Sequence, residues 1–143
     1  MTASVRAGDL TIPDDLLYLA TTDRIGHVSF VRPDGSVVTN LMWIDWDGEH
    51  ILTSSPVDSV KGRHLRKNPQ VSVSAVDRDD DWRYVIVRGR VTDIIPDKEL
   101  AFIDKMSMRY TDSPYRRRGF EREIFVITPD HINVSRGGWA RKR

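Results

Sequence analysis

The sequence predicts a mainly β protein of the α+β class, built as a six-stranded antiparallel barrel with flanking helices. Two Gly-containing connections of hairpin length, at 33–35 and 46–49, separate segments rich in β-branched and aromatic residues. Polar and apolar residues alternate along 70–76, as they do in a half-buried strand. Helical patterns are few and short, whereas a parallel α/β sheet needs a helix between successive strands. We therefore expect hairpin-linked strands around one core.

The expected order of elements is helix, three strands, helix, two strands, helix, strand. Pro13-Asp14-Asp15 opens a short helix that runs through Ala20, with acids in the first turn as the helix dipole favours. Pro96-Asp97 begins a longer helix, and Gly89 marks a bend in the long strand before it. The strands are expected at 25–32, 36–46, 50–54, 70–76, 83–95 and 123–128, the last continuing at 132–135.

Length and composition predict one domain at 12–143, preceded by a flexible N-terminal arm at 1–11 that lacks periodicity. Hydrophobic residues make up 39% of the 143 and charged residues 30%, which is typical of a globular protein. No apolar run approaches the roughly 20 residues of a membrane span, and no signal-peptide pattern is present. We therefore expect a cytoplasmic protein that does not bind membranes.

The composition also disfavours several functions. The absence of cysteine excludes disulfides, thiolate nucleophiles and cysteine-ligated zinc. The four histidines are scattered, without the i, i+4 pair of a helical metal site, so no metal is expected. A net charge of +1 argues against a general nucleic-acid binder. The positive charge is local, at 61–67, at 116–118 and at 136–143.

The most informative basic stretch is SSPVDSVKGRHLRKNPQ, residues 54–70. Ser55 is predicted as an N-cap, with Pro56 at the first helical position and Asp58 three residues after the cap. Asn68-Pro69 ends this helix. Three of its basic residues fall on the outward side, where solvent explains them: Arg63, Arg66 and Lys67.

Lys61 is different, because 100° steps place it between Val57 and Leu65 on the apolar side, with His64 beside them. An unpaired buried ammonium is very unfavourable, so Lys61 needs a route to water, a salt bridge or an anionic ligand. A ligand phosphate is one candidate, because helix N-termini and serines at strand ends supply hydrogen-bond donors. These readings stay open on the residues alone.

Two further residues stand out among the strands. Asn40 interrupts an apolar run, and its amide either makes a cross-strand bond or donates to a planar heterocycle. The tryptophans are more typical of cores and interfaces than of stacking platforms. This holds for Trp82 too, but it stands out because it follows a charged turn and precedes the long strand, where it would be placed to close a groove.

With these elements placed, three stretches carry a family resemblance: 35–43, 59–69 and 80–91. Their order and spacing over residues 12–136 resemble the split β-barrel flavin and deazaflavin proteins, the pyridoxamine 5′-phosphate oxidase-like superfamily. The likeness is greatest to the branch that uses the deazaflavin coenzyme F420. The chain lacks the fuller set of arginines and lysines that the oxidase itself would need to bind pyridoxal phosphate as substrate.

The resemblance implies a set of cofactor-binding residues. Lys61, with the backbone around Gly62 and His64, would bind the cofactor phosphate, and Ser54 would contribute from the strand end. The ring of the cofactor would lie against Thr39, Asn40 and Met42. Trp82 and Tyr84 would come from the facing part of the site. Family members are homodimers with cofactor sites at the subunit interface, so some of these groups would serve the partner's site.

The function implied is an oxidoreductase in which reduced F420 donates a hydride to an organic acceptor with a conjugated or carbonyl group. The arginines at 116–118 would then meet the acidic polyglutamate tail of F420. The alternatives are an FMN-dependent protein on the same barrel and a non-catalytic flavin or haem carrier. Tyr84 and His64 are candidate proton donors to the acceptor, but the sequence indicates no partner that would mark either as a tuned acid, so no catalytic residue is named.

Overall fold

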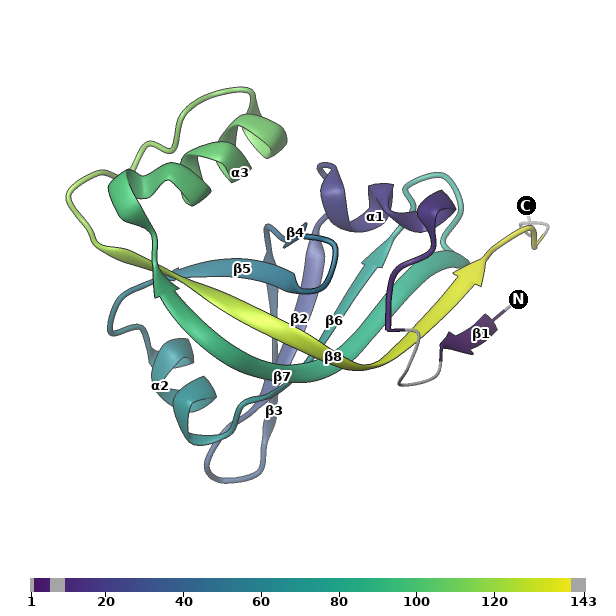
Figure 1. Ribbon diagram of the computed structural model, residues 1–143, viewed down its shortest axis with the longest axis horizontal. Helices are drawn as coiled ribbons and strands as arrows, with labels where there is room; N and C mark the ends of the chain where they lie inside the picture. The colour runs from purple at the N-terminus through teal and green to yellow at the C-terminus, as the bar shows by residue number, and fades with distance from the viewer. Residues whose placement is uncertain (1, 6–9, 140–143) are drawn as a thin grey trace.

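The computed structural model describes residues 2–5 and 10–139, and their strands form one antiparallel sheet with helices packed around it (Figure 1). The strands are β1 (Thr2–Val5), β2 (Gly26–Val31), β3 (Val37–Met42), β4 (Asp45–Trp46), β5 (Ile51–Pro56), β6 (Gln70–Val76), β7 (Arg83–Pro96) and β8 (Arg122–Arg136). The helical elements are η2 (Asp14–Leu16), α1 (Tyr18–Thr21), α2 (Val60–Lys67), η3 (Lys98–Leu100) and α3 (Ala101–Thr111). The predicted α+β class, mainly β, is confirmed.

The sheet has the strand order β3-β2-β6-β7-β8-β5-β4 and does not close into a full barrel. Its two end strands, β3 and β4, are joined only by Trp43 and Ile44. The predicted single strand at 36–46 therefore divides in two. The backbone of Ile44 bonds to a helix instead of a strand: its N–H donates to the Tyr110 hydroxyl (3.2 Å), and its C=O accepts from Arg109 (3.3 Å).

The strand count is eight instead of six, because β1 also joins the sheet. Residues Thr2–Val5, predicted to belong to a flexible arm, pair with Ile132–Ser135 of β8. The edge of β8 is open there, since β5 pairs only with the first half of the strand, Arg122–Ile127. Residues 6–9 of the predicted arm lie outside the described residues.

The core lies on the inner face of the sheet beneath α1. Its packing follows the two-residue alternation of the strands, which places every second side chain inside. Burial of this apolar area is the main favourable contribution to folding. The largest side chains with under 2% of their surface exposed include Leu16, Leu19, Val28, Ile44, Val73, Phe125 and Ile127.

The longest pair of strands, β7 and β8, is bent at two breaks in register, Arg88/Gly89 and Val91/Asp93. Gly89 allows the first break, because a Cβ atom there would overlap the Thr128 carbonyl and lie 3.1 Å from the Cα of Pro129. The predicted bend at Gly89 is confirmed.

The helix α2 begins four residues later than predicted. Ser55 and Pro56 extend β5 and pair with Glu123 and Arg122, so they are unavailable as a helix cap. Asp58 then turns the chain with a φ of 64°, and Ser59 becomes the N-cap by accepting the Gly62 N–H (2.9 Å). As a result Val57 lies outside the helix, and it and Val60 are exposed instead of facing the core.

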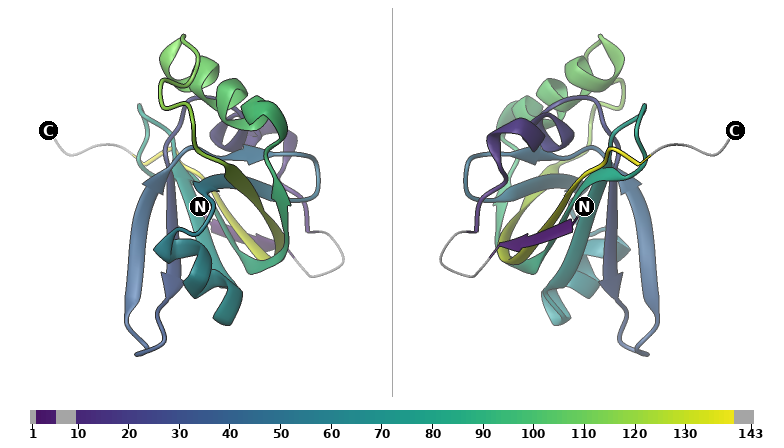
Figure 2. Two further views of the ribbon diagram at one scale, coloured as in Figure 1. Left: turned by 90° about the vertical axis from the view of Figure 1, so that its left-hand side faces the viewer. Right: turned by 90° about the vertical axis from the view of Figure 1, so that its right-hand side faces the viewer.

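The helix α3 is tied to the sheet by buried carboxylates. The Asp97 side chain accepts the backbone N–H groups of Phe102 (2.8 Å) and Ile103 (2.9 Å) at the start of the helix. Asp45, 4% exposed, accepts from Lys105 (3.0 Å) and Arg109 (2.9 Å). Figure 2 shows the result, with α3 at the top of the molecule and α2 towards the bottom.

Candidate anion-binding site

A cavity of about 340 Å³ lies where α3 and the first turn of α2 meet β5 and the start of β8. One side of it is apolar, formed by Leu41, Met42, Trp43, Phe102, Ile103 and Met106. The other side is polar and cationic, formed by Ser54, Lys61, Tyr115, Arg117 and Arg122. The cavity thus combines a surface suited to a planar apolar group with one suited to an anion.

Lys61 projects into this cavity from the first turn of α2. Its side chain has no hydrogen bond or ion pair to any residue that the structure describes. Burial lowers the pKa of Lys61 below its ordinary value, and the nearby Arg122 guanidinium lowers it further. Both effects disfavour the ammonium form in the absence of a ligand, and an anion in the cavity would reverse them.

Arg122 faces Lys61 from the start of β8. Burial lowers the pKa of this guanidinium as well. Its Nε donates to the Ser54 Oγ (3.1 Å), its Nη1 donates to the Tyr115 hydroxyl (3.3 Å), and its Cζ lies 5.1 Å from the centre of the Tyr115 ring. Because both hydroxyl oxygens accept from Arg122, their own hydrogens remain available to a ligand.

The antiparallel pairing of β5 with β8 produces this arrangement. Pro56 pairs with Arg122 and Ser54 pairs with Ile124, so Ser54 and Arg122 lie on the same face of the sheet. The chain then crosses residues 57–59 to reach the first turn of α2. Lys61 therefore lies beside the end of β5, which is close to it in sequence, and the start of β8, which is distant.

Neither of the two carboxylates next to Arg122 in sequence, Glu121 and Glu123, lines the cavity. Glu123, 6% exposed, points to the opposite face and forms a bidentate pair with Arg66 (2.7 and 3.0 Å). Arg66, predicted to be a solvated outward residue, thus has a specific partner. With Glu123 engaged by Arg66, neither Lys61 nor Arg122 forms an ion pair within the described residues, although the charge of Asp97 acts on Arg122 from further away. Two such cations in one cavity suit a phosphate.

Trp43 forms the boundary of the apolar side. Its ring stacks on Tyr110, with centroids 5.3 Å apart and planes at 14°, and meets Tyr115 edge-on at 6.1 Å. Such aromatic pairs hold one another in a defined orientation. The link between β3 and β4 is thereby rigidly placed beside the cationic side chains.

Of the nine predicted site residues, three line this cavity: Met42, Ser54 and Lys61. Met42 comes from the end of β3, Ser54 from β5, and Lys61 from α2. The structure thus brings these three side chains together, and their role in binding a cofactor stays a prediction.

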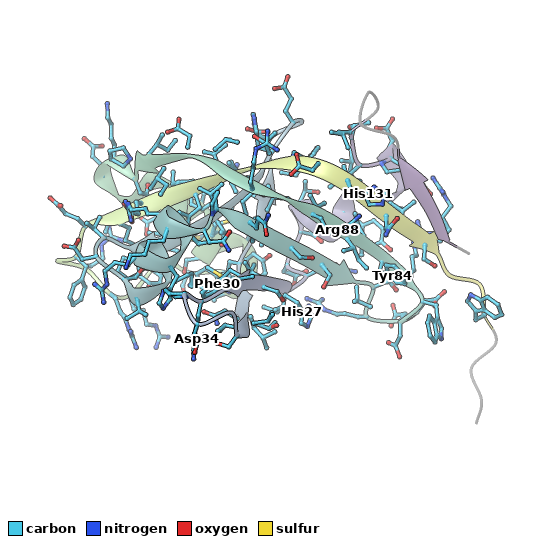
Figure 3. The ribbon with its side chains drawn as sticks, turned by 90° about the horizontal axis from the view of Figure 1, so that it is seen from below. His27, Phe30, Asp34, Tyr84, Arg88 and His131 are labelled. Carbon is cyan, nitrogen blue, oxygen red and sulfur yellow. The ribbon has the colours of Figure 1, made fainter. Side chains whose placement is uncertain are left out.

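Three others lie elsewhere on the fold and do not line the cavity. Thr39 is exposed on the outward face of β3, where its Oγ1 lies 2.8 Å from the Ser29 Oγ. Tyr84 lies half-buried on the outward face of β7, and Figure 3 shows it along the same face as Arg88. Trp82 is 56% exposed in the turn before β7. Their role in cofactor binding stays a prediction.

The remaining three, Asn40, Gly62 and His64, do not line the cavity either. Asn40 lies half-buried on the inward face of β3, and its amide bonds to none of the described residues. The Gly62 N–H is already used in capping α2, so it is not a free donor in this conformation. The His64 ring lies 6.3 Å from the ring of Phe30.

The residues that sequence reasoning missed are Arg122, Tyr115 and the aromatic and apolar side chains of α3. Arg122 falls one residue before the predicted strand at 123–128, and its relation to Lys61 depends on the pairing of β5 with β8. Tyr115 lies in a polar segment with no periodic pattern, where its position depends on a bond from its N–H to Asp104 (3.0 Å). No signal local to either residue marks it as part of a site.

The fold and the cavity define a class: a split barrel, open between β3 and β4, with a cavity lined by both apolar and cationic side chains. A family model described as pyridoxamine 5′-phosphate oxidase matches residues 13–136. The chain belongs to this family. The resemblance seen in the sequence is confirmed.

Solved structures support the same assignment. A structure named F420 reductase is 36% identical, with a TM-score of 0.77 over 85% of this chain and 98% of that one. General Stress Protein 26 from Bacillus anthracis str. Sterne shares the fold at 22% identity, with a TM-score of 0.64 over 85% of this chain and 92% of that one. So does the conserved hypothetical protein Rv2991 from Mycobacterium tuberculosis, at 20% identity and a TM-score of 0.71 over 97% of this chain and 96% of that one. No curated protein matches. The family and the F420 reductase relative together indicate an oxidoreductase.

Two further observations concern sites of other kinds. No helix in the described part of the chain is long and apolar enough to cross a membrane. Among those same residues, no three histidine, cysteine or acidic side chains are grouped so that they would hold a metal ion.

Proposed function

We propose that this protein is an F420H2-dependent reductase that transfers a hydride to a small organic acceptor. The observation that carries the proposal is the meeting of Lys61 and Arg122 in one cavity that no carboxylate of the described residues lines. The 36% identity to a protein named F420 reductase supports the choice of deazaflavin. FMN, whose phosphate monoester suits the same cations, is the alternative ligand.

In this proposal the polar side of the cavity holds the cofactor phosphate. Lys61 and Arg122 supply charge, and the hydroxyls of Ser54 and Tyr115 donate hydrogen bonds in directions that Arg122 sets. The apolar side, including Met42 and Met106, orients the ring and excludes water from it. Because the arginine is already held by two hydroxyls and an aromatic ring, little ordering is needed when the phosphate binds.

The bound deazaflavin supplies the redox chemistry: F420H2 gives up a hydride and a proton, becomes F420, and the acceptor gains two hydrogens. The protein's part is to orient and shield the ring. Neither Tyr84 nor His64, the two proton carriers considered from the sequence, lines the cavity.

The proposal is tested by titrating the purified protein with F420, FMN and riboflavin, following fluorescence. We expect F420 to bind at micromolar or lower concentration, and riboflavin, which lacks the phosphate, to bind at least tenfold more weakly than FMN. Oxidation of F420H2 by a panel of enones and quinones, followed by absorbance, then tests turnover. Tight FMN binding without F420 binding would contradict the deazaflavin assignment.

We also propose that the protein is a homodimer in which the outward face of β3, β2, β6 and β7 meets a second copy. Two of the predicted ring contacts, Thr39 and Tyr84, lie on this face and not in the cavity, as expected if they serve the partner's site. Val37 leaves 69% of its surface exposed there, and Leu41, which also lines the edge of the cavity, leaves 67%. Figure 3 shows Arg88 and His131 continuing this surface across β7 and β8.

Sedimentation velocity at about 50 μM tests this surface. We expect the unmodified protein to sediment as a dimer, and Val37→Lys to weaken dimerisation at least tenfold by placing a charge in a desolvated interface. The matched control is Val60→Lys, an equally simple change at a valine that is 59% exposed on α2, away from the face. A monomeric unmodified protein, or dimers unaffected by Val37→Lys, would refute the assignment.

A further inference from the structure

A second cavity, of about 280 Å³, adjoins the candidate site beneath the C-terminal half of α3. Trp43, Tyr115 and Arg117 line both cavities and separate them, while Ser107, Thr111 and Arg116 line only the second. The two cavities are therefore parts of one continuous surface with a shared aromatic wall.

The charge on this surface is one-sided. Four cationic side chains line the two cavities, namely Lys61, Arg116, Arg117 and Arg122, and no carboxylate among the described residues does so. The chain as a whole is nearly balanced, with 22 lysines and arginines against 21 acids. Folding has therefore concentrated positive charge at this place, which raises the local concentration of anionic ligands.

The three consecutive arginines of this segment do not share one role. Arg118 donates to Asp104 (2.6 Å), and the same carboxylate accepts the Tyr115 N–H, so these contacts anchor the segment to α3. Arg116 and Arg117 have no ion-pair partner within the described residues. They are held at the cavity by their neighbour's salt bridge and keep their own charge uncompensated.

The other polar groups of the second cavity are occupied. The Thr111 hydroxyl donates to the Ser107 C=O (2.8 Å), and the Thr111 Oγ1 lies 3.3 Å from the Ser107 Oγ and 3.1 Å from the Ser113 Oγ. The groups left for a ligand are thus the aromatic wall of Trp43 and Tyr115 and the two arginines. An aromatic wall favours a planar group, and a guanidinium favours a carboxylate in the plane of its donors.

We propose that the second cavity binds the hydride acceptor, and that the acceptor is a planar molecule carrying a carboxylate. This inference rests on the proposed function for the identity of the reaction. The carboxylates of the cofactor's tail are the other source of the same chemistry. An extended, flexible tail would not stack on the aromatic wall, whereas a ring system with an acidic substituent would contact both the wall and the arginines.

Calorimetric titration with 2-naphthoate tests the cavity without any cofactor. We expect the unmodified protein to bind 2-naphthoate at least tenfold more tightly than its neutral methyl ester, and Arg116→Ala to remove this difference. Arg116 is chosen because it lines only the second cavity. Arg32→Ala, which removes an exposed arginine from the 32–36 turn, is the matched control and should change nothing. Equal binding of acid and ester would overturn the inference.

Titration with F420 and with F420 stripped of its glutamates separates the two sources of carboxylate. We expect Arg116→Ala to leave the affinity for both forms unchanged. A tenfold loss confined to the glutamylated form, with 2-naphthoate binding intact, would assign Arg116 to the tail and overturn the acceptor role. If the unmodified protein binds 2-naphthoate through Arg116 but neither F420 nor FMN, the proposed function fails while the anionic preference of the second cavity stands.

Discussion

Replacement of Lys61 by methionine is expected to weaken FMN and F420 binding by about 10- to 100-fold, the loss typical of one hydrogen bond to a charged group. Riboflavin binding should not change, because riboflavin has no phosphate. The same substitution should raise the melting temperature of the ligand-free protein by a few degrees, because it removes a half-buried ammonium that has no partner among the described residues. Thermal unfolding followed by circular dichroism, with and without ligand, measures both effects.

The pH dependence of ligand affinity tests whether the charge of Lys61 is responsible for phosphate binding. Burial and Arg122 hold the pKa of Lys61 below its ordinary value in the free protein, and a bound phosphate would raise it. Affinity should therefore be highest below the free-state pKa and fall as the pH rises through it, a dependence that Lys61→Met removes. The difference in stability between Lys61→Met and the unmodified protein should be largest below the folded-state pKa of Lys61, where the folded protein carries the unfavourable charge. This stability difference should disappear as the pH rises from the pKa of Lys61 in the folded state to its pKa in the unfolded state.

Lys67→Met is the matched control, because Lys67 is exposed on the outward side of the same helix. We expect it to leave ligand affinity and its pH profile unchanged. The phosphate assignment would be wrong if Lys61→Met bound FMN as tightly as the unmodified protein. A fall in melting temperature for the ligand-free variant would instead show that Lys61 stabilises the fold.

Replacement of Gly89 by alanine is expected to destabilise the protein by about 3 kcal/mol or more, as overpacking against backbone does. The added Cβ would overlap the Thr128 carbonyl oxygen and approach its carbon to 2.9 Å, so β7 and β8 would have to separate. These strands are at the centre of the sheet, and β8 also carries Arg122. Urea unfolding followed by tryptophan fluorescence measures the loss.

Gly35→Ala is the comparison for this prediction. Gly35 has a φ of 85°, which disfavours alanine, but no atom lies within 4 Å of the added Cβ. We expect its cost to be about 1 kcal/mol, from backbone conformation alone. If Gly89→Ala were no more destabilising than Gly35→Ala, the close approach of β7 to Thr128 would not be a feature of the protein in solution.

The predictions for α2 were correct for the orientation of its basic side chains and wrong for the residue at which the helix begins. The prediction that Lys61 faces inward while Arg63 and Lys67 face solvent agrees with the structure, as 3.6-residue periodicity predicts for residues within one helix. Val57, placed on the inward side by the same steps, lies outside the helix and is exposed. The prediction of the cap failed, because Ser55 and Pro56 had a second option that the sequence does not reveal, namely pairing with β8. A local start signal was overridden by a strand pairing with a distant segment.

The candidate site was predictable to a similar extent. Met42, Ser54 and Lys61 lie close together in the sequence, in β3, β5 and α2, so a family resemblance over this part of the chain includes all three. Arg122 bonds to Ser54 across 68 positions, and Tyr115 lies in a segment without a pattern. Their place in the cavity is not a property of any window of sequence.

The sequence by itself determined the antiparallel, mainly β class and the unusual position of one lysine, because turn chemistry, alternation and helix phase are local. Tertiary structure decided which charges remain uncompensated. Because β5 pairs with β8, Glu123 binds Arg66 on one face of the sheet, and Arg122 lies beside Lys61 on the other. Asp104 binds Arg118, whereas Arg116 and Arg117 form no ion pair within the described residues. The physical reason is that ion pairs depend on distance in space, which strand register sets and sequence order does not.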